Sequence, residues 1–445
     1  MPPVAQATAR EQTARQATYS LPFILVLAYV FVDFGRPQDW IPPLQLLHPG
    51  VIVLGGGIFA LIFYRSSSIP KIGKYLLAFL FIMAIGTLFA YNKHMAFIAT
   101  KDLALLLFGA VLPIMIFVDS YRKIQVLFRF WVFIHILLAL YSIRHGGMGT
   151  GYFLADENDF CLVINMVLPY AFFMLFTVKS KAERFFLVII IVVFFLAIVS
   201  TMSRGGFLGL LAVALFCWFF TPRKILSFFI ILALSISFFI VTPDSYWKEM
   251  NTIKTSTQEE DTGYQRLYLW GIAWKLFLHD PVIGVGPTNF QYRAFVYESE
   301  YEKERGFHVW GRVCHSLYLT LLSEEGLLGA AVFLLILLSA WKERKKIRSY
   351  YKKSVFKTNL SNSGQEKLRM IYYMTMAVDA SLMAYLVTGA FITVLYYPHF
   401  WLLTAFSVVL KKVFDVILKE EGAKQGLGIP NHSLQTLQAV HPAVQ

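Results

Sequence analysis

Long apolar runs, separated by short polar connections, restrict what this chain can fold into. A helix of about 20 mostly apolar residues crosses the hydrocarbon core of a bilayer, where the backbone must satisfy its own hydrogen bonds. Twelve such runs occur, near residues 20–35, 50–64, 75–91, 102–118, 125–143, 160–178, 184–201, 205–221, 224–241, 315–341, 371–390 and 393–414. We therefore predict an all-α fold, a polytopic membrane helical bundle of about 12 transmembrane helices.

Composition supports a membrane protein and argues against several other classes. Hydrophobic residues make up 57% of the chain and charged residues 15%, and the mean hydropathy is +0.59. The net charge of +13 resides mainly in the short connections, where anionic lipid headgroups explain it, so we expect no nucleic-acid partner. Cys161, Cys217 and Cys314 are too few and too scattered for a disulfide framework or a thiolate metal site.

The distribution of lysine and arginine between alternate connections predicts the orientation. Positive residues near the ends of spans are retained in the cytoplasm, and one set of connections is much the richer in them. With twelve spans, both termini are cytoplasmic, and no signal peptide is expected to be removed. The predicted organisation is a cytoplasmic tail at 1–19, nine spans within 20–241, a large extracytoplasmic loop at 242–314, a span at 315–341, a basic cytoplasmic loop at 342–370, two spans within 371–414 and a disordered tail at 415–445.

Two arginines on the predicted extracytoplasmic side are candidate anion-binding residues. Arg204 lies in Thr201-Met202-Ser203-Arg204-Gly205-Gly206 between two apolar runs, where its planar fork can bind a phosphate while the glycines leave room for a headgroup. Arg266 lies in a predicted helix from Gly263 to Leu278. Two arginines from different segments suit a diphosphate leaving group. The alternative for Arg204 is an arginine at the membrane interface that extends to the lipid headgroups. The alternative for Arg266 is a position on a solvated helix face.

His315 directly precedes a predicted span and is a candidate proton acceptor. Histidine is the side chain best suited to accept a proton near neutral pH, so an acceptor hydroxyl could be activated there. The alternative is an interfacial histidine that is only hydrogen-bonded. Glu324 and Glu325 follow within the apolar run, and on a continuous helix Glu325 lies nearer the face of His315.

Three further features each have two interpretations. The acidic cluster at 156–159 suits a divalent cation or sugar hydroxyls, or is a helix N-cap. Asp379, in the middle of an apolar run, is the best argument for a transporter with a proton-relay carboxylate. The glycine-rich stretch from Gly284 to Phe290 lacks the ending of a P-loop, so it is a weak nucleotide signal.

Taken together, these segments resemble the O-antigen ligase and polymerase superfamily over about residues 150–341. Its members have a Ser-Arg-Gly-Gly motif at the start of a span, here Ser203 to Gly206. A large late loop follows, with an arginine and a tryptophan on a helix, a Gly-Val-Gly turn and a His-Asn-x-Tyr-Leu…Glu-x-Gly stretch. The corresponding residues are Arg266 with Trp270, Gly284 to Phe290 and His315 to Gly329, with Ser316 where the family commonly has Asn.

The resemblance implies a bacterial inner-membrane glycosyltransferase whose active site faces the periplasm. It implies an undecaprenyl-diphosphate-linked glycan as donor, lipid A–core or another glycan as acceptor, inversion at the anomeric carbon, and no metal or cofactor. Arg204 and Arg266 then bind the diphosphate and His315 activates the acceptor. Candidate substrate-binding residues are Ser203, Gly205, Tyr264, Trp270, Asn289, Tyr318 and Glu325.

We expect an O-antigen ligase first. A polymerase or a protein O-oligosaccharyltransferase of the same superfamily is the nearest alternative, because these enzymes differ in the acceptor rather than in the donor. A secondary transporter also commonly has twelve spans, but it places its charged residues near the midplane rather than at one face. A non-catalytic assembly protein is the remaining possibility, and it would tolerate loss of Arg204, Arg266 and His315.

Overall fold

The computed structural model describes residues 20–65, 67–151, 154–221, 262–304, 306–354 and 360–424, with isolated positions between 224 and 236. The first half contains α2 (Leu21–Gly35), α3 (Pro37–Trp40), η1 (Pro42–Leu47), α4 (Pro49–Tyr64), α5 (Lys71–Phe89), α6 (Lys93–Leu106), the π-helical η2 (Leu107–Val111), α7 (Leu112–Phe117), α8 (Tyr121–Arg144), α9 (Glu157–Met174), α10 (Lys181–Ser200) and α11 (Arg204–Phe220). The second half contains α14 (Thr262–His279), α15 (Phe290–Arg293), η4 (Ala294–Tyr297), α16 (Glu300–Glu304), α17 (Leu317–Ser354), α18 (Asn362–Thr388), η5 (Gly389–Phe391) and α19 (Pro398–Lys424).

The predicted helical membrane protein is confirmed, but the count of twelve spans is not supported. Among the described residues, six helical stretches are long and apolar enough to cross a membrane by length and composition. They are Lys71–Phe89, Lys93–Phe117, Tyr121–Arg144, Lys181–Ser200, Leu317–Lys353 and Asn362–Phe391. Three shorter apolar helices, α2, α4 and α11, add to them. The predicted span at 224–241 lies mostly outside the described residues.

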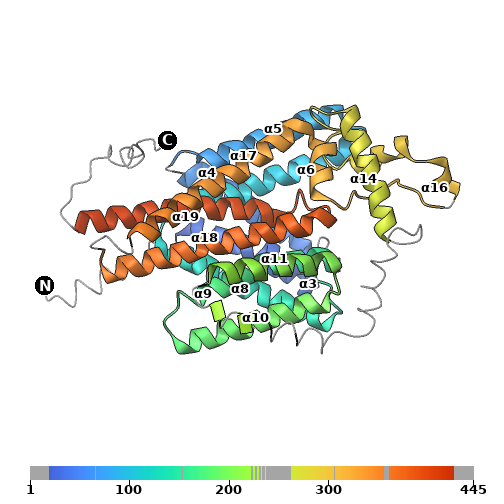
Figure 1. Ribbon diagram of the computed structural model, residues 1–445. Coiled ribbons are helices and arrows are strands. Elements are labelled where there is room, and N and C mark those ends of the chain that lie inside the picture. The colour runs from blue at the N-terminus through green and yellow to red at the C-terminus, as the bar shows by residue number, and fades with distance from the viewer. Residues whose placement is uncertain are drawn as a thin grey trace, which may run out of the picture.

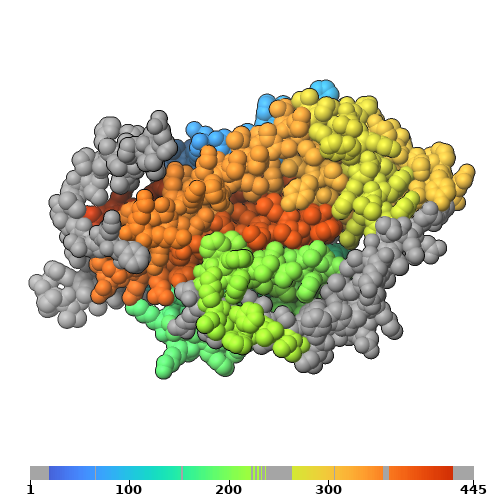
Figure 2. Space-filling view, in the orientation of Figure 1, coloured from blue at the N-terminus to red at the C-terminus, as the bar shows by residue number. Residues whose placement is uncertain are grey.

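The long helices lie side by side around α18, which packs against α9, α11 and α19 (Figure 1). On one side, α17 packs against α5, and on the other, α9 packs against α8 and α10. In the space-filling view, α18 is visible in a hollow between α17 and α11 (Figure 2). Helix α14 lies across one end of the bundle, beside the end of α11. The long helices therefore form the scaffold, and α14 covers one of its ends.

Helix ends differ from the predicted spans where polar residues continue or start a helix. The predicted span at 102–118 begins already at Lys93, because the side chain of Asn92 caps α6 by accepting a hydrogen bond from Met95 N at 3.1 Å. Helix α17 continues past 341 to Ser354, and α18 starts at Asn362, so most of the predicted loop at 342–370 is helical. Likewise α19 continues to Lys424, into the predicted tail at 415–445.

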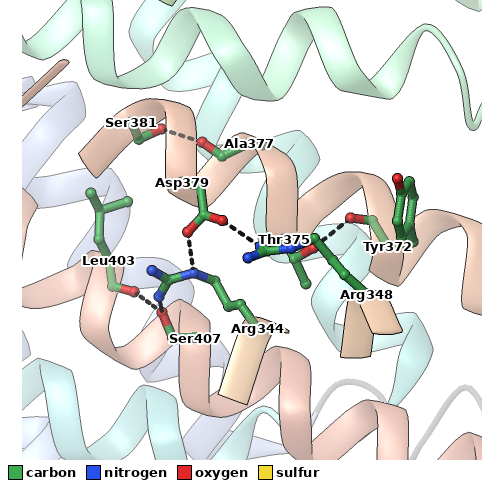
Figure 3. Close-up of polar contacts among 9 residues, drawn as sticks. All are labelled: Arg344, Arg348, Tyr372, Thr375, Ala377, Asp379, Ser381, Leu403 and Ser407. Atoms are coloured by element: carbon green, nitrogen blue, oxygen red, sulfur yellow. Dashed lines mark hydrogen bonds and ion pairs between the residues drawn. The ribbon is translucent and has the colours of Figure 1, made fainter. Parts of the chain in front are cut away.

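Asp379 forms ion pairs with two arginines. A carboxylate paired in this way no longer supports the interpretation of Asp379 as a proton relay of a transporter. Its carboxylate accepts a hydrogen bond from Arg344 Nε at 2.6 Å and another from Arg348 Nη1 (Figure 3). Arg344 is buried, and its Nη1 donates to Ser407 Oγ at 2.5 Å. The group joins α17, α18 and α19, and a charge inside a bundle is stable only when it is paired in this way.

Helix α17 is interrupted at Gly326, and the chain before α15 packs into the interruption. Gly326 has φ 62° and ψ −165°, a conformation that side chains with a Cβ rarely adopt. Val285 N donates to Ser323 O at 2.8 Å, and Leu327 N donates to Pro281 O at 2.8 Å. The freed backbone groups of the broken helix are thus satisfied by the late loop, which fixes that loop against the bundle.

Glu324 completes this attachment with its side chain. Its carboxylate accepts hydrogen bonds from Thr288 N at 2.9 Å and from Phe290 N at 3.0 Å. The hydroxyl of Tyr396 lies 2.7 Å from an oxygen of Glu324 and 2.7 Å from an oxygen of Glu325. The Gly284-to-Phe290 turn therefore binds a carboxylate of its own chain, which explains the glycine-rich sequence without a nucleotide.

Candidate functional site

A cavity of about 320 Å³ lies at the end of the bundle that α14 covers. Four segments far apart in the sequence form its walls. They are the start of α9 (156–158), the turn between α10 and α11 (201–205), one face of α14 (265–269) and the segment before α17 (312–315). Arg204, Arg266 and His315 all line this cavity, as do Ser203 and Gly205.

Ser203 fixes the position of Arg204. Its hydroxyl caps α11 by accepting a hydrogen bond from Gly206 N at 3.0 Å, and it donates to Asn158 Oδ1 at 2.7 Å. Arg204 is the first residue of α11, so its backbone is held between the capped turn and the start of α9. Both α9 and α11 begin at the cavity, and helix N-termini favour anions.

The two glycines after Arg204 have different roles. Gly205 lines the cavity, as the predicted approach of a headgroup requires. Gly206 instead packs against α9, because a Cβ there would lie 2.1 Å from Cys161 Sγ. The carbonyl oxygen of Gly206 also accepts a hydrogen bond from Asn165 Nδ2 at 2.8 Å. The second glycine of the motif thus serves helix packing, which holds the starts of α9 and α11 together.

Arg266 and His315 line the cavity from two segments other than that of Arg204. The predicted helix from Gly263 to Leu278 is confirmed as α14, one residue longer at each end, and it presents Arg266 to the cavity. His315 has φ 52°, and its backbone N–H donates to Thr393 Oγ1 at 2.8 Å. It directly precedes the helical start of α17 at Leu317, as the sequence predicted.

The surroundings of His315 favour its neutral form. Burial lowers the pKa of His315 from its ordinary value, the positive charges of Arg266 and Arg312 lower it further, and Asp156 opposes them. A neutral imidazole has a free nitrogen lone pair that can accept a proton. The site therefore holds a proton acceptor among cations that suit a bound anion.

The cavity carries three arginines against two carboxylates. Arg204, Arg266 and Arg312 supply the positive charge, and Asp156 and Glu157 supply the negative charge. Asp156 is the N-cap of α9, accepting from Asn158 N at 2.8 Å, so the N-cap interpretation of the acidic cluster is confirmed. Among the residues that the structure describes, no three His, Cys, Asp or Glu side chains are grouped to hold a metal ion. The arginines make the cavity suitable for a phosphate or diphosphate group.

The structure places the other predicted substrate-binding residues outside the cavity lining. Tyr264 donates to Glu302 Oε1 at 2.7 Å within the loop, and Trp270 packs near Phe391 with ring centroids 6.5 Å apart. Tyr318 donates to Leu386 O at 2.7 Å on a half-exposed surface.

The last two predicted residues, Asn289 and Glu325, are fully buried. Asn289 Oδ1 accepts from Asn92 N at 2.7 Å, which attaches the late loop to the turn before α6. His315 lies before α17, which starts at Leu317, and its φ of 52° is not helical, so His315 and Glu325 do not belong to one continuous helix. The helical-wheel argument for Glu325 therefore fails.

Arg312 is the cavity residue that the sequence did not single out. Its Nε donates to His308 O at 2.8 Å, and its guanidinium lies 4.3 Å from the ring centroid of Phe307. These contacts hold the side chain beside His315. The available signal was its spacing, three residues before His315 in the same extracytoplasmic segment.

Comparison with known families gives a match over the middle of the chain. Residues 187–334 match the family model described as O-Antigen ligase. The match includes Arg204, Arg266, Arg312 and His315, and it leaves out the acidic start of α9. No curated protein matches the chain. Residues 187–334 are therefore similar to an O-antigen ligase domain, which supports the predicted resemblance to the O-antigen ligase superfamily.

Proposed function

We propose that the protein is an O-antigen ligase, which transfers a glycan from undecaprenyl diphosphate to lipid A–core with inversion and without a metal. The observation that carries the proposal is the convergence of Arg204, Arg266 and His315 on one cavity from three separate segments. The family match over 187–334 supports a lipid-linked glycan as the class of substrate.

The arginines are assigned to the donor. A diphosphate carries several negative oxygens, and guanidinium groups bind such oxygens in pairs of parallel hydrogen bonds. Negative charge on the leaving diphosphate grows as the glycosidic bond breaks, so positive groups placed beforehand stabilise the transition state more than the ground state. Arg204 and Arg266 line the cavity from different segments of the chain, and Arg312 adds a third positive charge to its lining.

His315 is assigned to the acceptor. The acceptor hydroxyl gives its proton to the neutral imidazole while its oxygen forms a bond to the anomeric carbon. The bond from that carbon to the diphosphate oxygen breaks, and undecaprenyl diphosphate leaves with the electron pair. Attack from the face opposite the leaving group inverts the anomeric configuration.

We also infer the placement of the protein in the membrane. The nine apolar helical stretches, together with α9, α19 and the span that the sequence predicts at 224–241, would give about 12 crossings. Lysines gather at the end remote from the cavity, on α17 and α19. By the positive-inside rule, that end and both termini face the cytoplasm of a bacterial inner membrane, and the cavity faces the periplasm.

A polymerase or a protein O-oligosaccharyltransferase needs the same donor site and differs in the acceptor. The test is glycan transfer by the purified protein in liposomes that contain undecaprenyl-diphosphate-linked glycan and lipid A–core. We expect transfer to lipid A–core by the wild type and its loss in Arg204→Ala and His315→Ala at normal thermal stability. Arg293→Ala is the matched control, because Arg293 lies outside the cavity on the same end of the protein.

The products of the wild type separate the three activities. Lengthening of the lipid-linked glycan would replace the ligase by a polymerase, and transfer to a protein hydroxyl would replace it by an oligosaccharyltransferase. Full transfer activity in Arg204→Ala and His315→Ala would contradict the assignment of the site.

A further inference from the structure

A second and larger cavity, of about 700 Å³, lies between α5, α17 and α19. Its part of α17 includes Leu335, Leu338, Lys342 and Lys346, which lie at intervals of three and four residues on one face. Lys342 is roughly 35 Å along α17 from its start next to His315, at a rise of about 1.5 Å per residue. This groove is therefore separate from the candidate active site.

The groove is strongly basic. Five lysines line it against two carboxylates, and they are Lys71, Lys342, Lys346, Lys411 and Lys412 against Glu343 and Asp415. Each carboxylate already has a lysine, since Lys346 lies 3.1 Å from Glu343 and Lys411 lies 2.5 Å from Asp415. The surplus of positive charge is complementary to a bound anion.

Lys71 and Lys342 supply the positive charge of the groove that is not already paired with a carboxylate or bonded to a carbonyl oxygen. Both side chains are exposed, and within the described part of the chain neither has a carboxylate within 4.0 Å. Lys412 is engaged differently, because its Nζ donates to Ile116 O at 2.6 Å at the end of α7.

The groove is also apolar on the side toward the middle of α17. Leu335 and Leu338 are 44% and 42% exposed, and Ile72 and Val408 also line the groove. Lys342 follows Leu338 by one helical turn. Along this face of α17, apolar side chains are followed by a lysine. A phospholipid has the matching order, with its acyl chain beside the apolar side chains and its phosphate beside the lysine.

The buried charge cluster determines which face of α17 borders the groove. Arg344 and Arg348 point inward to Asp379, as Figure 3 shows, while Lys342 and Lys346 on the opposite side point to the groove. The two arginine bonds fix the rotation of α17 about its axis. The lysines are thereby presented to the groove in the folded protein before any ligand binds.

We propose that this groove is a binding site for one anionic phospholipid. Its phosphodiester lies between Lys71 and Lys342, and an acyl chain covers Leu335 and Leu338. The apolar wall distinguishes a lipid from free phosphate, which would use the lysines alone. The site does not depend on the activity proposed for the other cavity.

The test measures lipid retention by native mass spectrometry of the whole protein in detergent, with added phosphatidylglycerol or phosphatidylcholine. The variant Lys71→Gln/Lys342→Gln removes the two groove lysines that, within the described part of the chain, have neither a carboxylate within 4.0 Å nor a hydrogen bond to a carbonyl. The control Lys74→Gln/Lys345→Gln removes the same charge from the same helices, three residues further along each, outside the groove. We expect one phosphatidylglycerol on the wild type and the control, and affinity weaker by about tenfold or more in the groove variant.

Competition with glycerophosphate separates a lipid site from a phosphate site. Displacement of phosphatidylglycerol by glycerophosphate at equal concentration would overturn the proposal, because it would show that the acyl chain adds no affinity. Equal retention of phosphatidylglycerol in both double variants, or equal retention of phosphatidylcholine by the wild type, would also overturn it. Melting temperatures of both double variants within a few degrees of the wild type are required for these comparisons.

Discussion

The hydroxyl of Ser203 donates to Asn158 Oδ1 at 2.7 Å and so joins two cavity walls that are 45 positions apart in the sequence. The same hydroxyl caps α11. One side chain thus holds the first turn of α11, with Arg204 on it, against the start of α9. The arginine of the Ser-Arg-Gly-Gly motif is positioned by the serine that precedes it.

We predict that Ser203→Ala lowers glycan transfer several-fold while costing only about 1 kcal/mol of stability, the usual cost of losing an N-cap. The measurement is kcat/KM in liposomes together with thermal unfolding. Ser180→Ala is the matched control, because Ser180 caps α10 by accepting from Glu183 N at 3.4 Å and lies outside the cavity. Equal transfer rates for the two variants would contradict the positioning role.

The pH dependence of transfer should follow the protonation of His315. Burial, Arg266 and Arg312 lower the pKa of His315 below its ordinary value of 6.5, so the neutral base persists at moderately acidic pH. Activity should therefore be constant near neutrality and fall only below pH 6.5, as the imidazole becomes protonated.

Two substitutions should shift the loss of activity at acidic pH, the acid limb of the pH profile, in opposite directions. Arg312→Gln removes a positive charge, raises the pKa of His315 and moves the limb to higher pH. Asp156→Asn removes a negative charge, lowers the pKa of His315 and moves the limb to lower pH, while asparagine still caps α9. The check is the pH profile of kcat/KM, and shifts in the same direction for both variants would rule out His315 as the titrating group.

Gly326→Ala should destabilise the protein by at least about 1–3 kcal/mol, the cost of a residue with a Cβ in this region of φ and ψ. A Cβ at 326 would lie 2.4 Å from Val282 O, so the late loop must also move away from α17. Thermal unfolding in detergent measures the loss. Gly271→Ala is the control, because nothing lies within 4 Å of its Cβ position and alanine favours the helix.

Asp379→Asn should cost about 3–5 kcal/mol, because it leaves Arg344 and Arg348 buried without a negative partner. Replacing all three residues by methionine should restore much of the lost stability, since a well-packed apolar group often substitutes for a buried ion pair. The triple variant should also transfer glycan. A folded triple variant without activity would give Asp379 a role beyond packing.

The sequence predicted a helical membrane protein correctly because hydrocarbon requires long apolar runs, but its count of twelve spans is not supported by the described helices. It predicted their ends poorly where charged residues continue the helix, as from Lys342 to Ser354, since helix formation there depends on contacts such as Arg344 with Asp379. The break at Gly326 was also missed, because its cause is the packing of a segment distant in the chain.

For the candidate site, too, some of the residues that the sequence predicted line the cavity and others do not. Arg204 and His315 were identified because a polar side chain directly beside an apolar run is unusual, and both line the cavity. Arg312 was missed because arginine is ordinary in a polar loop, although its spacing of three residues from His315 was visible in the sequence. Asn289 and Glu325 were placed in the site by their motifs, but they are buried in contacts that attach the late loop.

The close contacts of α11 also limit how this sequence can change over time. A Cβ at Gly206 would meet Cys161, and one at Gly209 would lie 2.1 Å from Thr388 Oγ1. A larger residue at either glycine is tolerated only if its neighbour becomes smaller in the same lineage. Positions 161 and 206, and positions 209 and 388, should therefore covary among homologues. Arg204, two residues before Gly206, should instead be constrained by the anion that it binds.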